Sequence, residues 1–108
     1  MSSPDHPLLA FSTFPDLETA RKIARTLVEE KHAACANLIP QIESIYHWQG
    51  KIESTAEVLV LFKTTAKNYP AFEQRLRALH PYEVPEIVAI NITAGLPDYL
   101  KWIAGSIS

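Results

Sequence analysis

Val58-Leu-Val-Leu-Phe62 is an unbroken apolar run near the middle of a chain of 108 residues. Side chains alternate between the two faces of a strand, so a run that is apolar at every position needs cover on both faces. The sequence therefore predicts a central strand, with helices on one face. A second surface must cover the other face.

The apolar run belongs to the second arm of a predicted long hairpin. The first arm extends from Ala33 to Trp48, Gln49-Gly50 supplies the turn, and the chain is extended again from Ile52. Arms of about a dozen residues exceed the usual strand length of about five or six. Strand that projects past a core usually pairs with another chain, so the hairpin favours self-association. The alternative is a shorter, twisted hairpin whose predicted ends are too long.

Strand and helix patterns alternate on both sides of the hairpin. Asp16 and Asn68 are the expected N-caps of two amphipathic helices, and Pro97 opens a short terminal helix. The expected elements are strand 8–14, helix 17–31, the two hairpin arms, helix 69–79, strand 87–93 and the terminal helix. This order predicts an α+β fold, a ferredoxin-like βαββαβ sandwich with a long central hairpin and an additional C-terminal helix, in which the first and third strands are central.

Length and composition narrow the classes of protein. With 47% apolar residues, the chain suits one domain over residues 1–108, with 1–7 as a flexible lead. Ten basic and twelve acidic residues leave a formal charge of -2, with no Lys or Arg run, which disfavours nucleic acid as a partner. No leader pattern and no span of about 20 apolar residues is present, so we expect a cytoplasmic protein without membrane insertion.

The segment His80-Pro81-Tyr82-Glu83-Val84-Pro85-Glu86 is the chief candidate for chemistry. Its two prolines make a stiff connector. Imidazole with carboxylates can hold zinc or copper when a further ligand arrives from elsewhere. The alternative is a solvated corner, in which His80 binds a helix-end carbonyl and both glutamates face water. Extended backbone would place Glu83 and Glu86 on opposite faces, which favours the solvated corner.

Three further residues stand out in the hairpin. Cys35, the only cysteine, is either a small apolar residue at the head of a strand or a soft copper ligand. Trp48 beside the turn is either a plug packed on a neighbouring subunit or a stacking platform. Lys63 follows the most apolar strand, where an ammonium group needs a carboxylate or a route to solvent, and Glu86 is the expected partner.

An enzymatic role is disfavoured by what the sequence lacks. No local motif links a nucleophile to a base, and the three glycines form no phosphate-binding pattern. We therefore expect a protein that is not an enzyme and has no organic cofactor.

Five separated motifs resemble the CutA family of divalent-cation tolerance proteins. They are Ala33-Ala-Cys-Ala-Asn-Leu-Ile-Pro40, Ile45-Tyr-His-Trp-Gln-Gly-Lys51, Phe62-Lys-Thr-Thr65, the 80–86 segment and Asp98-Tyr-Leu-Lys-Trp102. The resemblance extends over residues 8–103. It implies a ferredoxin-like subunit, a homotrimer like that of the nitrogen-regulatory PII proteins, and a link to copper and other divalent cations.

The resemblance also implies metal ligands. In one bacterial branch of the family, the proposed copper ligands fall at positions equivalent to Ser12, Leu79 and His80. Of these, only His80 can bind a metal here, and Cys35 matches the family's motif cysteine. The candidate metal ligands are therefore His80 and Cys35, with copper as the first candidate ion and zinc as the second.

The remaining family-matched residues suggest a cleft between subunits. Its candidate lining residues are Trp48, Lys63, Tyr82 and Glu86. In the alternative hypothesis the protein is a PII-like signalling or scaffold module, and this cleft binds a small anion or a partner protein.

Overall fold

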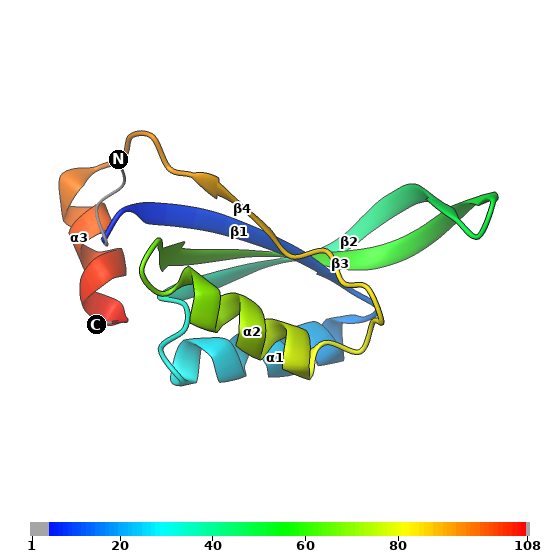
Figure 1. Cartoon of the computed structure of the whole chain (residues 1–108), viewed down its shortest axis with the longest axis horizontal. Helices are drawn as coiled ribbons and strands as arrows, with labels where there is room; N and C mark the ends of the chain where they lie inside the picture. The colour runs from blue at the N-terminus through cyan, green and yellow to red at the C-terminus, as the bar shows by residue number, and fades with distance from the viewer. Residues whose placement is uncertain (1–4, 108) are drawn as a thin grey trace.

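A four-stranded antiparallel sheet with two helices against one face forms the body of the protein (Figure 1). The structure is a computed structural model and describes residues 5–107. The elements are β1 (Pro7–Phe14), α1 (Leu17–Glu29), β2 (Cys35–Trp48), β3 (Lys51–Thr65), α2 (Tyr69–Leu79), β4 (Val88–Asn91) and α3 (Pro97–Ser106). The strand order β2-β3-β1-β4 places the first and third strands in the centre. The predicted ferredoxin-like α+β class is confirmed.

The core lies between the sheet and the helix pair. Val58, Val60 and Phe62 of β3 are buried there, and Phe62 meets Phe72 of α2 edge to face with 5.1 Å between ring centroids. Leu27 of α1 joins the same cluster. Each such side chain contributes about 1.5–3 kcal/mol when it leaves water, so this row holds the helices to the sheet.

The other face of the sheet is open over much of its area. Phe11 of β1 lies directly opposite Leu61 of β3 and Val88 of β4, and all three are only partly buried or exposed. Helix α3 stands at one end of the sheet (Figure 1), where Ile103 packs against Ala34. The apolar run of β3 is thus two-sided as predicted, but only one face is fully covered within the chain.

The hairpin of β2 and β3 projects well beyond the helices, and the protein measures 43 Å along its longest axis (Figure 1). Gln49 and Gly50 at its tip have φ values of 50° and 78°, the left-handed conformations that a two-residue hairpin turn requires. Glycine adopts this conformation without steric cost. The long predicted hairpin is therefore confirmed.

Several predicted boundaries need correction. Helix α1 ends at Glu29 because Lys31 already has a φ of 62°, and β4 is shorter than the predicted 87–93. Asn68 precedes α2 but its side chain makes no cap; its amide donates to Thr65 Oγ1 instead.

Asp16 caps α1 as predicted, accepting from Thr19 N at 2.7 Å. Strand β1 begins at Pro7, inside the expected flexible lead, while residues 1–4 of that lead lie outside the described residues.

Candidate functional site

His80 sits at the end of α2 with both ring nitrogens bound to backbone groups. Its Nε2 lies 2.8 Å from the carbonyl oxygen of Thr13, and the backbone N–H of Tyr82 donates to Nδ1 at 3.2 Å. A carbonyl can only accept and an N–H can only donate, so the ring carries its proton on Nε2. His80 was expected to bind a carbonyl at the end of a helix, but its partner is a carbonyl of β1. Neither ring nitrogen is free for a metal.

Aromatic rings enclose the imidazole. The Phe14 ring stacks on it with 4.6 Å between centroids, the Tyr82 ring lies 4.9 Å away, and His80 is only 8% exposed. Burial lowers the pKa of His80, although the Thr13 carbonyl and the Glu57 carboxylate act to raise it. His80 is consequently a neutral structural residue at pH 7.

A second hydrogen bond fixes the same corner to β3. The Tyr82 hydroxyl donates to Glu57 Oε2 at 2.6 Å, and Glu57 is 9% exposed. Burial, followed by the contact with Glu57, raises the pKa of Tyr82 well above its usual value, so the hydroxyl stays a donor. Glu83 and Glu86 of the same corner are exposed. Glu57 was not predicted from the sequence, because only the fold brings it to Tyr82.

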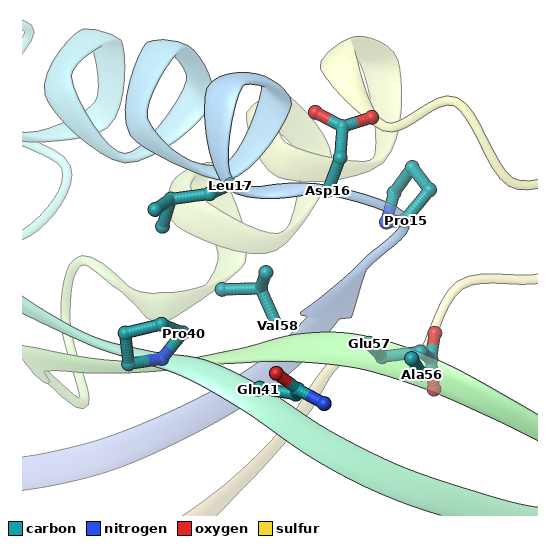
Figure 2. A pocket seen from close by; sticks show the side chains of 8 residues that line it. All are labelled: Pro15, Asp16, Leu17, Pro40, Gln41, Ala56, Glu57 and Val58. Carbon is teal, nitrogen blue, oxygen red and sulfur yellow. The ribbon is translucent and has the colours of Figure 1, made fainter.

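A shallow pocket of about 200 Å³ lies next to this corner (Figure 2). It forms where the β2–β3 register shifts between Ile39 and Ile42, so that Pro40 and Gln41 of β2 stand against the single residue Val58 of β3. Its two acidic side chains already have partners: Asp16 caps α1, and Glu57 accepts from Tyr82. The backbone and side-chain groups of Thr19 lower the pKa of Asp16.

Lys63 has a different environment from the one expected. Its ammonium group donates to Asn37 Oδ1 at 2.5 Å, lies 3.9 Å from Cys35 Sγ, and sits 5.8 Å from the centre of the Tyr99 ring. The predicted ion pair with Glu86 does not form within the described part of one chain. In the sheet register, Lys63 lies opposite Leu9 near the start of β1, whereas β4, which follows Glu86, begins opposite Phe11.

The predicted metal ligands and cleft residues do not converge within one chain. Cys35 shares a row with Lys63 and Leu9, while His80 contacts Thr13 and Phe14 at the other end of β1. Trp48 lies at the hairpin tip, roughly 40 Å along β3 from Lys63 at about 3.3 Å per residue. A cleft that combines these cleft residues therefore needs more than one chain.

A metal centre does not fit the residues of one chain. Among residues 5–107, no three His, Cys, Asp or Glu side chains are grouped so that they could hold a metal ion. Both nitrogens of His80 are occupied, and Cys35 lies beside the positive charge of Lys63, which repels a cation.

No described helix is long and apolar enough to cross a membrane.

These features define a class: a ferredoxin-like α+β subunit with an open apolar sheet face and a projecting two-stranded arm. A family model for the CutA1 divalent ion tolerance protein matches residues 8–106. The chain belongs to this family.

Relatives of known structure or name agree with this assignment. The divalent-cation tolerance protein CutA of Thermus thermophilus is 50% identical over 91 residues, which is 84% of this chain and 88% of that protein. Protein CutA of Mus musculus is 50% identical over 94 residues, 87% of this chain, but this chain spans only 53% of the mouse protein. The crystal structure of CutA from Xylella fastidiosa gives a TM-score of 0.93 at 48% identity, covering 95% of this chain and 99% of that one.

Proposed function

We propose that this chain works as a cytoplasmic, non-enzymatic homotrimer in the response of the cell to divalent cations. Membership of the divalent ion tolerance family supports the cation-related role. The observation that supports assembly is the projecting arm, which is the part of the β2–β3 hairpin around its tip, residues 45–52. Its side chains Ile45, Trp48 and Ile52 are 67%, 46% and 63% exposed.

The arm is a poor structure for a solitary chain. A two-stranded hairpin by itself is marginally stable in water. Large apolar side chains that gather on a surface usually mark an interface. The open sheet face adds Val88 and Ile90, which are also exposed. Association in a closed ring of three would cover both the arm and the sheet face.

The assembly is tested with a charge placed on the arm. Ile52→Lys puts an ammonium group where the proposal needs apolar contact, so light scattering should report a lower mass than for the unaltered protein. Glu53→Lys, at the neighbouring exposed position, is the matched control and should leave the mass unchanged. An unchanged mass for Ile52→Lys would refute assembly through the arm.

The metal-binding part of the proposal concerns the assembled protein. Because one chain groups no three candidate ligands in its described residues, we propose that copper, or else zinc, is bound by side chains of more than one subunit. Calorimetric titration of the assembled protein with Cu(II) and Zn(II) should give saturable binding. The variants Cys35→Ala and His80→Ala then decide whether either side chain contributes. Absence of saturable binding for both ions contradicts this part.

A second candidate function is a PII-like module that binds a small ligand. The observation that favours it is Lys63, a partly buried ammonium group for which the described chain provides no carboxylate. A thermal-shift screen of small metabolites tests this function: stabilisation by a metabolite supports it, and stabilisation by metal ions alone opposes it.

A further inference from the structure

We propose that Lys63 and Asn37, flanked by Cys35 and Tyr99, form a binding site for a small oxyanion, either a carboxylate or a phosphate group. The inference rests on the second candidate function and names the class of ligand. The site lies on the sheet face opposite α1 and α2, next to helix α3.

Lys63 lacks a counter-charge. The residue is partly buried, and a positive charge at such a position is favoured by a negative partner or by strong hydrogen bonds. In the described part of the chain, no carboxylate lies within ion-pair distance of it. Its partners are an amide oxygen, a thiol sulfur and the face of an aromatic ring, all of them neutral acceptors for an ammonium group. The positive charge is held in place but is not compensated.

The side-chain amide of Asn37 has a defined orientation next to Lys63. Because an ammonium group can only donate, Asn37 must present its amide oxygen to Lys63, as the structure shows at 2.5 Å. Its NH2 group has no hydrogen-bond partner within residues 5–107. Lys63 and Asn37 therefore offer a charged and a neutral donor next to each other, which suits an acceptor with two oxygens.

The backbone that carries Lys63 and Asn37 is rigid. Cys35 lies directly opposite Lys63 across the β2–β3 ladder, and Asn37 follows two residues later on the same face. Both donors thus stand on paired strands and not on a loop, so little conformational entropy is lost when a ligand binds. The ring of Tyr99 from α3 limits the movement of the lysine side chain.

These three observations select the chemistry of the ligand. A cation is repelled by Lys63, and a neutral molecule would leave its charge uncompensated. An oxyanion satisfies both donors with charge-assisted hydrogen bonds. A carboxylate of a second copy of this chain could supply the same chemistry, and the experiment below separates the two sources.

The test uses NMR titration of the complete, isotope-labelled protein with inorganic phosphate and with acetate, at constant ionic strength set by sodium chloride. The side-chain amide signals of Asn37 should shift saturably. Lys63→Met should weaken this binding about tenfold or more, because the charged donor is lost. The control Lys67→Met removes an exposed lysine just beyond β3 and should bind like the unaltered protein.

The outcomes are distinct. Saturable shifts that depend on Lys63 support the site. Absence of saturable shifts in the unaltered protein, as expected if a second chain supplies the carboxylate, overturns it, and so does equal binding by Lys63→Met. Light scattering on the same samples judges the trimer separately, since an intact trimer without anion binding refutes only this inference.

Discussion

His80 uses both ring nitrogens, Nε2 to join the end of α2 to β1 and Nδ1 to hold the N–H of Tyr82, and this limits what the residue can do. Its Nδ1 accepts from the Tyr82 N–H, so a proton added at Nδ1 would face another donor. Protonation therefore breaks this contact. The same geometry explains why His80, a candidate metal ligand in the 80–86 segment, has a structural role here.

The stability of the fold should depend on this imidazole below neutral pH. Burial lowers the pKa of His80 in the folded chain, whereas the unfolded chain keeps a value of about 6.5. Below pH 6.5 the unfolded state thus binds more protons, and stability falls as the pH drops toward the folded-state pKa, by at most about 1.4 kcal/mol per pH unit. Above about pH 7 this contribution is constant.

Urea unfolding between pH 5 and 8 measures the effect. His80→Gln can keep both backbone contacts without titrating, so its stability should approach that of the unaltered protein as the pH falls. His47→Gln is the control, because it replaces a histidine of β2 that contacts neither Thr13 nor Tyr82. Parallel curves for His80→Gln and the unaltered protein would rule out His80 as the source.

Ser12 is the second residue whose role can be measured. It is fully buried in the core, and its Oγ has no hydrogen-bond partner among the described residues. An unpaired buried hydroxyl costs about 1–3 kcal/mol, so Ser12→Ala should stabilise the protein by about 1 kcal/mol in urea unfolding. Thr64→Val is the matched contrast: its hydroxyl donates to the His32 carbonyl at 2.8 Å, and its loss should destabilise. A destabilised Ser12→Ala variant would show that the hydroxyl is satisfied.

Pairing between individual side chains was the least predictable level. The sequence predicted a carboxylate or a route to solvent for Lys63 and selected Glu86, whereas Lys63 donates to Asn37, and nothing in the sequence indicated that Tyr82 bonds to Glu57. The Lys63 contacts depend on the β2–β3 register, whereas the Tyr82 contact depends on where the 80–86 connector passes β3. The bulge after Ile39 offsets β2 against β3 by one residue, and periodicity along a single strand does not reveal it.

At the scale of elements, the connector between α2 and β4 is held at two points. His80 ties its start to β1, and Tyr82 ties it to β3 through Glu57. Strand β4 then pairs with β1 over only four residues. The connector therefore does much to position an edge strand whose own ladder is short.

The Tyr82–Glu57 contact can be measured by a double-mutant cycle. Tyr82→Phe leaves the carboxylate of Glu57, a residue that is 9% exposed, without this donor and should cost about 1–3 kcal/mol of unfolding free energy. In a Glu57→Gln background, the same change should cost less, because an amide is easier to bury than a charge. Equal costs in the two backgrounds would show that the hydrogen bond contributes nothing.

Most elements could be predicted because their patterns are strong. The apolar run at 58–62 identified the central strand, and the turn residues Gln49 and Gly50 located the hairpin. Strand β4 was predicted too long because its flanking residues are also apolar or β-branched, whereas the β1–β4 ladder runs only from Phe11–Val88 to Leu8–Asn91 and is followed by a single backbone hydrogen bond from Ile92 to Pro7. Periodicity describes one segment at a time and does not show where its partner strand ends.

At the scale of the whole molecule, the fold leaves apolar surface that its own helices cannot reach. Helices α1 and α2 cover one sheet face, α3 covers one end, and the arm extends past all three (Figure 1). Trp48 and Lys63 are far apart within one chain, so they could line one cleft only if a second chain took part. The exposed arm likewise needs a second chain to cover it. Both features are explained if neighbouring subunits complete what each chain lacks.

We expect three copies of this chain to associate through the arm and the open sheet face. Light scattering coupled to size-exclusion chromatography, at micromolar concentration and physiological salt, measures this association. The molar mass should be three times that of the 12.1 kDa chain and should be maintained on dilution. A mass of a single chain would contradict it.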